Sequence, residues 1–298
     1  MPVLTDTRAV LLVVISGVLW GSSFVVIKVG LQYVDVIWFA FLRMLLASGL
    51  GLAGIRLLSG TPNASLLRDR SLWFLGISSG VAFVLQNIAL LYTTAGKTSL
   101  LVNLNVIGVA MLSWRVTGER FGMRGILALT LGSAGLVLLT TNGEISALAT
   151  GQSLGDLLAL ITAVIWAFFT TVSKQVVSRA GIAVSQVSTL ILSMTAVTLA
   201  PIALLSDPAQ IAGIEPIGWL LMVYTALFCT TIPYFLWNLG LTKLSATNSA
   251  LILLVEILVA SVGGFIVFQE SFGIVAAVGA FLIIAAIVLT IRRSGVPD

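Results

Sequence analysis

Apolar runs of about 20 residues fill most of the chain, and each run is long enough to cross a bilayer as a helix. Charged residues make up only 9% of the sequence and lie mainly at the borders of these runs. The sequence therefore predicts an all-α polytopic membrane protein with the lipid bilayer as its surroundings. We expect ten spans, at residues 9–30, 36–58, 71–92, 98–116, 123–141, 153–174, 184–206, 216–237, 246–268 and 272–291.

The basic residues are unevenly divided between the two faces that these spans define. With the N-terminus in the cytoplasm, twelve of the fifteen Lys and Arg residues fall on the cytoplasmic side: Arg8, Arg56, Arg68, Arg70, Arg115, Arg120, Arg124, Lys174, Arg179, Lys243, Arg292 and Arg293. The opposite side carries Lys28, Lys97 and six acids: Asp35, Glu144, Asp156, Asp207, Glu215 and Glu270. The positive-inside rule predicts that both termini face the cytoplasm, in the cytoplasmic (inner) membrane. The basic excess thus indicates topology, not nucleic-acid binding.

The two halves of the chain resemble each other. "WGSSFVVIK" at 20–28 returns as "WAFFTTVSK" at 166–174, a shift of 146. "LQNIALLYTTAGKTSLL" at 85–101 aligns with "LWNLGLTKLSATNSALI" at 236–252, and "TGERFG" at 117–122 with "FQESFG" at 268–273, both at a shift of 151. We predict a first repeat over 1–141, a linker over 142–152 and a second repeat over 153–298. Each repeat contains five of the ten spans. Because five is odd, the second repeat enters the membrane from the side opposite to the first and is therefore inverted.

Four stretches are similar to the ten-helix EamA branch of the drug/metabolite transporter superfamily. They are "GVLWGSSFVVIKVGL" at 17–31, "FLRMLLA" at 41–47, and the Glu-containing turns at Glu119 and Glu270. The resemblance covers nearly the whole chain and implies a transporter, commonly an exporter of amino acids or other metabolites in bacteria. The sequence departs from the family at Ile257, where a Pro often follows the Glu of the ninth helix, so a kink at this point is left open.

Inverted repeats are typical of secondary transporters that work by alternating access, with the substrate near the bilayer midplane. Glu256 lies near the middle of the ninth span, and its repeat equivalent is Asn105. An acid at that depth indicates a counter-ion for a substrate amine, a proton-coupling site, or a protonated structural group. Arg43, inside the second span, either binds substrate or has a structural role, pairing with an acid or bonding carbonyls at a helix end.

Helical spacing adds further candidates. Trp20, Phe24 and Lys28 share one helix face, as do their counterparts Trp166, Thr170 and Lys174. We predict that the substrate contacts Trp20, Phe24, Trp166 and Thr170, and add Ser23, Ser79, Asn103, Tyr234 and Glu256 as polar or aromatic candidates. The pair Gly17 and Gly21 indicates close helix packing rather than function.

Pro233, in the eighth span, is expected to act as a gating hinge, although such a kink can also be purely architectural. A proline removes one backbone N–H and leaves the carbonyl of Cys229 without its helical partner. Thr230 and Thr231 are close enough in sequence to help satisfy carbonyls that such a kink frees.

These residues favour a zwitterionic amino acid as the substrate, with the ammonium near Glu256, the carboxylate near a donor such as Asn103, and the side chain against Trp20 and Trp166. Export is what the resemblance implies. Lipophilic cations, with Glu256 as counter-ion, are the alternative substrate, and a non-transporting membrane scaffold is a third reading. The chain has no His and one Cys, so we expect no metal and no cofactor. "AGKTS" at 95–99 lacks the first Gly of a phosphate-binding loop, and no enzyme activity is expected.

Overall fold

The computed structural model describes residues 7–58, 61, 63–116, 118–119, 122–143, 153–179, 181–269 and 272–293, and within them every regular element is helical. Ten stretches of these residues are long and apolar enough to cross a membrane. The predicted all-α polytopic architecture is thereby confirmed, with span bounds close to the expected ones. Arg120, Glu144, Glu270 and most of the predicted linker fall outside the described residues.

Most spans are single helices: α1 (Thr7–Gly30), α2 (Val36–Leu58), α3 (Arg70–Tyr92), α6 (Met123–Thr141), α7 (Ser153–Val177), α8 (Val184–Leu205) and α14 (Ile274–Arg293). The fourth span consists of α4 (Ala95–Asn103) and α5 (Asn105–Val116). The eighth is made of α10 (Pro216–Ala226), the π-helical segment η3 (Leu227–Thr231) and α11 (Ile232–Leu241), and the ninth of α12 (Ala246–Ile252) and α13 (Val255–Phe268). Short helices η1 (Ala64–Arg68) and α9 (Ala209–Ala212) lie in connections.

The fourth and ninth spans are interrupted at nearly equivalent points of the repeat. The break between α4 and α5 is at Leu104, and that between α12 and α13 is at Leu253 and Leu254. At the second break the N–H of Glu256 donates to the carbonyl of Leu253 (2.8 Å), three residues back, in place of an α-helical bond. The N–H of Ile257 donates likewise to Leu254 (3.3 Å), so the ninth helix is broken without a proline at this position.

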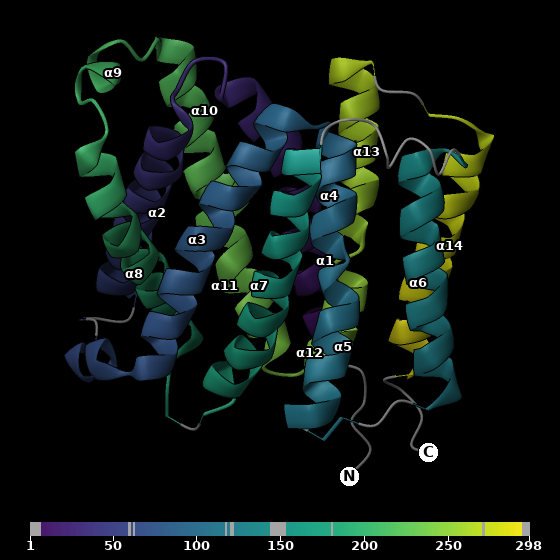
Figure 1. Cartoon of the computed structure of the whole chain (residues 1–298). Coiled ribbons are helices and arrows are strands. Elements are labelled where there is room, and N and C mark those ends of the chain that lie inside the picture. Colours follow the sequence, from purple (N-terminus) through teal and green to yellow (C-terminus); the bar gives the residue numbers. More distant parts are fainter. Residues whose placement is uncertain are drawn as a thin grey trace.

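Helices from each half of the chain pack against helices of the other half. From the first half, α1 packs on α11 and α13 of the second, while α7 of the second half packs on α3 and α5 of the first. At opposite sides of the bundle, α2 packs on α8 and α6 on α14 (Figure 1). This reciprocity matches two inverted repeats, because each helix contact recurs between the repeat equivalents. The core is therefore shared between the halves.

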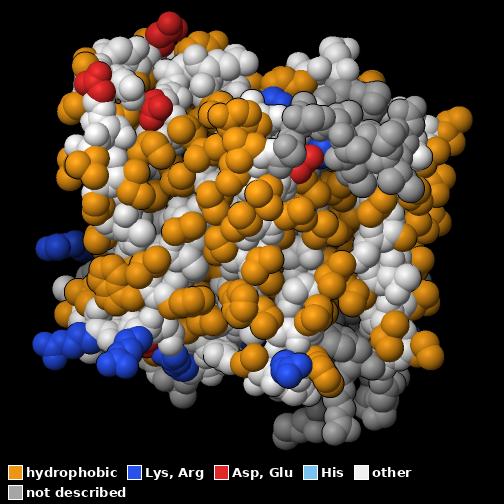
Figure 2. All heavy atoms as spheres, viewed as in Figure 1, with side chains coloured by type: hydrophobic (Ala, Val, Ile, Leu, Met, Phe, Trp, Pro, Cys, Tyr) orange, Lys and Arg blue, Asp and Glu red, His pale blue; other side chains and the backbone are white. Residues whose placement is uncertain are grey.

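Charge is separated along the bundle. On the face seen in Figure 2, apolar side chains cover the middle, Lys and Arg gather mainly toward the lower end, and Asp and Glu lie mainly toward the upper end. The chain enters α1 and leaves α14 at the lower, basic end (Figure 1). This is the distribution from which the positive-inside rule predicts topology.

Candidate functional site

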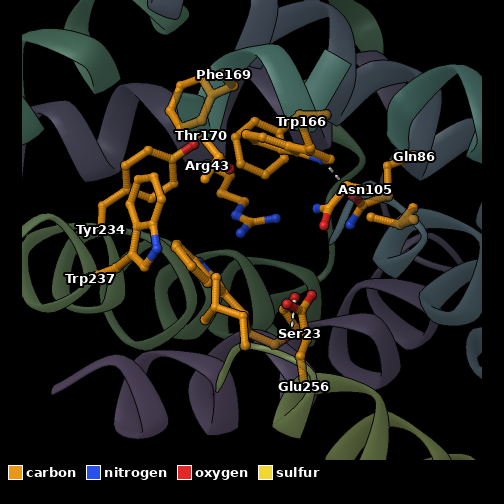
Figure 3. A pocket seen from close by; sticks show the side chains of 14 residues that line it. Ser23, Arg43, Gln86, Asn105, Trp166, Phe169, Thr170, Tyr234, Trp237 and Glu256 are labelled. Atoms are coloured by element: carbon orange, nitrogen blue, oxygen red, sulfur yellow. Dashed lines mark hydrogen bonds between the residues drawn. The ribbon is translucent and has the colours of Figure 1, made fainter. Parts of the chain in front are cut away.

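A cavity lies between the two halves, bounded by α1, α2, α3, α7 and α11 and by the two broken spans (Figure 3). Its empty volume is about 560 Å³, counting the open space at its mouth. The residues that line it are Trp20, Ser23, Arg43, Phe83, Gln86, Val102, Asn105, Trp166, Phe169, Thr170, Tyr234, Trp237, Leu253 and Glu256. Seven of these were predicted from the sequence: Trp20, Ser23, Arg43, Trp166, Thr170, Tyr234 and Glu256.

The lining residues are related by the repeat. All but Arg43 and Thr170 form equivalent pairs at the shifts of 146 and 151: Trp20 with Trp166, Ser23 with Phe169, Phe83 with Tyr234, Gln86 with Trp237, Val102 with Leu253, and Asn105 with Glu256. Each half thus contributes the same positions to one shared cavity, as expected for a site at the interface of inverted repeats.

Sequence reasoning missed half of the lining, although a signal for it was present. Applying the repeat shift to Tyr234 leads to Phe83, and applying it to Ser23 leads to Phe169. Asn105 was identified as the equivalent of Glu256 but not included among the candidate site residues. In three of the repeat-related pairs the two residues differ in chemical type, so the side of the cavity formed by the first half differs from the side formed by the second. The first half supplies the polar Ser23, Gln86 and Asn105, whereas the second half supplies Phe169, Trp237 and Glu256 at the same positions.

Glu256 occupies the first turn of α13, directly after the break. The positive end of the helix dipole favours an acid in a first helical turn. Its equivalent Asn105 is the first residue of α5, after the break in the fourth span. No described side chain forms an ion pair with Glu256, so its carboxylate is available to a ligand in the cavity.

Glycines bring α1 against this break. A Cβ atom built on Gly21 would lie 2.4 Å from the carbonyl oxygen of Glu256, and one on Gly17 would lie 2.4 Å from Val255. Real Cβ atoms do not approach other atoms so closely, so only glycine fits at both positions without movement. The predicted packing role of Gly17 and Gly21 is confirmed, and their packing fixes the start of α13 beside the cavity.

Arg43 projects from α2 into the cavity and is 1% exposed. Its Nε donates to the Thr230 hydroxyl (2.7 Å), and its Nη2 donates to the carbonyl of Cys229 (2.9 Å). The guanidinium also lies 4.9 Å from the centre of the Phe83 ring, a cation–π contact. Of the structural roles considered, bonding to helix carbonyls is the one observed.

The helix around Pro233 is widened into the π-helical turn η3. The N–H of Ile232 donates to the carbonyl of Leu227, five residues back. The hydroxyls of Thr230 and Thr231 donate to the carbonyls of Thr225 and Ala226 (2.8 Å each). The threonines thus satisfy helix carbonyls, but the Cys229 carbonyl that Pro233 frees accepts from Arg43 instead. Pro233 itself is buried and does not line the cavity.

Six of the fourteen residues that line the cavity are aromatic. Trp20 packs edge-on against Tyr234 (ring centroids 5.5 Å apart) and lies 5.8 Å from Trp237. Trp166 packs edge-on against Phe83 (5.2 Å) and Phe169 (5.0 Å). The indole N–H of Trp166 donates to Gln86 (3.2 Å; dashed line in Figure 3), which fixes the ring across the two halves. Such rings offer large apolar surface at low entropic cost.

Three predicted substrate contacts lie outside the cavity. Phe24 is 1% exposed in the apolar core. The Ser79 hydroxyl bonds to Thr195 on α8 (2.5 Å). Asn103 donates to the carbonyl of Ser99 within its own helix (2.9 Å). The cavity donor in this region is Asn105, on the other side of the break at Leu104.

The two lysines that end the repeated motif each bond to the C-terminal end of a neighbouring helix. The Lys28 ammonium donates to the carbonyl of Thr93, at the C-terminus of α3 (2.8 Å). The Lys174 ammonium donates to the carbonyl of Leu241, the last residue of α11 (2.8 Å). A cation is favourable at the negative end of a helix dipole. Each lysine therefore joins the first span of its repeat to the end of the third span.

Glu119 lies near the contact between Lys174 and the end of α11 and binds the start of the next helix. Its carboxylate accepts from the N–H of Ala246 (3.1 Å) and the hydroxyl of Thr247 (2.9 Å), at the N-terminus of α12. It also attracts the ammonium of Lys174. The turn between α11 and α12 is thus held by a cation at one helix end and a carboxylate at the next, each matching the dipole. The repeat equivalent, Glu270, is not among the described residues.

The sequence matches the model of the EamA-like transporter family over residues 7–141 and again over 153–292. It is 26% identical over 289 residues to an uncharacterized transporter of Archaeoglobus fulgidus, which covers 97% of this chain and 99% of the relative. It is also 26% identical over 285 residues to the uncharacterized transporter YetK of Bacillus subtilis, over 93% of this chain and 85% of YetK.

One solved crystal structure has the same fold. It superimposes with a TM-score of 0.76 at 20% sequence identity, over 96% of this chain and 98% of that chain. At this level of identity the likeness concerns the arrangement of helices, and it agrees with the ten spans described above.

Proposed function

The chain belongs to the EamA-like transporter family, and from this premise we propose that it exports amino acids across the cytoplasmic membrane by alternating access. The single observation that carries the substrate class is the presence of Arg43 and Glu256 in one cavity with aromatic walls. A carboxylate and a guanidinium that do not pair with each other offer one partner for each charge of a zwitterion. The rings of Trp20 and Trp166 offer surface for an apolar side chain.

The alternative substrate class, lipophilic cations, fits this cavity less well. Glu256 could act as a counter-ion for a cation, and the aromatic rings could bind it by cation–π contacts. Arg43, however, keeps a positive charge inside the same cavity, and like charges repel strongly where water is scarce. A ligand with only a positive charge lacks a partner for Arg43.

The contacts at the two ends support alternating access. Lys28 and Lys174 are repeat equivalents at opposite ends of the bundle, and each joins the first and third spans of its own repeat. We expect release of the Lys174 contact to open the cytoplasmic side and release of the Lys28 contact to open the outer side. Inverted repeats make two such states equivalent in structure, which is the basis of alternating access in secondary transporters.

Orientation and location form part of the proposal. We place the basic end of the bundle in the cytoplasm, with both termini there, because of the positive-inside rule. The proposed transport cycle covers two forms: one in which Glu256 carries a coupled proton, and one in which substrate is exchanged without a coupled ion.

Counterflow in proteoliposomes tests the function directly. Vesicles loaded with unlabelled leucine or phenylalanine should take up the labelled amino acid, and protein-free vesicles should not. Repeating the assay across a pH gradient separates proton-coupled transport from exchange. Uptake of a lipophilic cation with none of any amino acid would replace the substrate class, and uptake of neither would favour the scaffold reading.

A further inference from the structure

We propose that Arg43 and Tyr234 form the subsite that binds the carboxylate group of the substrate. This rests on the proposed function, since it assigns one end of the amino acid within that cavity. It replaces the sequence-based placement of the carboxylate near Asn103, whose amide is occupied within its own helix.

Two of the three guanidinium nitrogens of Arg43 donate hydrogen bonds to described residues, and the third does not. Nε and Nη2 donate to Thr230 and Cys229, which orient the planar group from the side of the eighth span. No acceptor among the described residues bonds to Nη1, and no described carboxylate pairs with Arg43. Figure 3 shows the guanidinium pointing toward the middle of the cavity. A buried cation without a counter-ion is unfavourable, and a bound carboxylate would supply one.

Tyr234 contributes a second donor beside Arg43. The residue is 1% exposed, and its hydroxyl has no hydrogen-bond partner among the described residues. The Ser79 side chain interacts with this hydroxyl, but not with the geometry of a hydrogen bond. The Ser79 hydroxyl bonds to Thr195 (2.5 Å) and to the carbonyl of Gly76 (3.1 Å). A buried hydroxyl without a partner is costly, so this group is expected to find an acceptor in at least one state of the transport cycle. A carboxylate accepts from a phenol and a guanidinium together.

The repeat shows that this hydroxyl is specific to one side of the cavity. The equivalent of Tyr234 is Phe83, which has the same ring without the oxygen and lies against Arg43 as a cation–π partner. Tyr234 lines the same cavity as Arg43 (Figure 3). The guanidinium is therefore flanked by a repeat-related Phe and Tyr, and the only difference between the two rings is a donor suited to an anion.

Ligand binding can be followed through the tryptophans of the cavity wall. Trp20, Trp166 and Trp237 line the site, so intrinsic fluorescence of the purified full chain reports occupancy. The probes are phenylalanine, 3-phenylpropionate, which lacks the amine, and phenethylamine, which lacks the carboxylate. We expect Tyr234→Phe to weaken the two carboxylates at least about three-fold, and Arg43→Lys at least about ten-fold, because Lys cannot reproduce the planar, multi-donor geometry. Neither variant should weaken phenethylamine.

Tyr224→Phe is the matched control, since Tyr224 belongs to the same span but does not line the cavity. Equal weakening of all three probes, no effect on the carboxylates, or no binding of carboxylates to the wild type would each overturn the subsite. The proposed function fails in a distinguishable way. If no amino acid is transported while 3-phenylpropionate still binds through Arg43 and Tyr234, the subsite stands and amino-acid export does not.

Discussion

The guanidinium of Arg43 donates a hydrogen bond to the backbone carbonyl of Cys229, 2.9 Å away. This carbonyl is the group whose α-helical partner would be the N–H of residue 233, which proline lacks. The intramembrane charge and the helix-breaking proline, separate features of the sequence, are therefore parts of one arrangement. It joins α2 to the π-helical turn of the eighth span and orients a cation at the cavity wall.

Replacing Pro233 with Ala should slow transport without unfolding the protein. The restored N–H would compete with Arg43 for the Cys229 carbonyl and favour a regular helix over the π-helical turn. We expect counterflow to fall several-fold and the unfolding temperature to stay equal or rise. Pro201→Ala, at a proline inside α8, is the matched control and should transport normally. Full activity of Pro233→Ala would reduce Pro233 to an architectural role.

Glu256→Gln should lower transport about ten-fold or more, or abolish its pH dependence, while the protein still assembles. Glutamine has nearly the same size but cannot neutralise an ammonium group, and a hydrogen bond to a charged group is worth about 1.5–3 kcal/mol. The measurement is counterflow at several pH values, with assembly checked by size-exclusion chromatography. Glu215→Gln removes an acid at the start of α10, away from the cavity, and should have no effect. Unchanged flux and pH dependence in Glu256→Gln would remove Glu256 from the mechanism.

Gly21→Ala should destabilise the protein by about 1–3 kcal/mol, the usual cost of overpacking. The added Cβ would lie 2.4 Å from the Glu256 carbonyl oxygen and 2.7 Å from the Cβ of Val259, so α1 and α13 must move apart. Gly54→Ala is the control, because a Cβ at this position would have no neighbouring atom within 4 Å and alanine is the better helix former. Thermal unfolding in detergent measures both, and equal stabilities would show that α1 adapts without strain.

Lys174→Met and Lys28→Met should open opposite sides of the cavity. Each removes a cation from the C-terminal carbonyls of a helix that it holds in place. Access can be measured with Ser23→Cys as a reporter, in a Cys229→Ala background, using a membrane-impermeant thiol reagent applied from either side. We expect Lys174→Met to raise labelling from the cytoplasmic side and Lys28→Met from the outer side. Identical labelling patterns in the two variants would contradict a gating role for the lysines.

Much of the fold and part of the site could be predicted because their signals are local or repeated in the sequence. The ten spans follow from the length of each apolar run, and the equivalence of Asn105 and Glu256 follows from the shift between the halves. Phe24 and Asn103, which were chosen by spacing along one helix, do not line the cavity. Such spacing predicts which residues share a face, but not which face meets the cavity.

The sequence by itself thus determined a ten-helix membrane protein with two related halves, since hydrophobic length and internal similarity need no knowledge of contacts. Only the tertiary structure decided that Arg43 reaches Cys229, that Tyr234 and Phe83 flank it, and that both broken spans meet at one cavity. The physical reason is that the rotation of a membrane helix is set by packing against helices distant in the chain. Those contacts, here between α1 and α13 and between α7 and α5, join helices from the two different halves of the sequence.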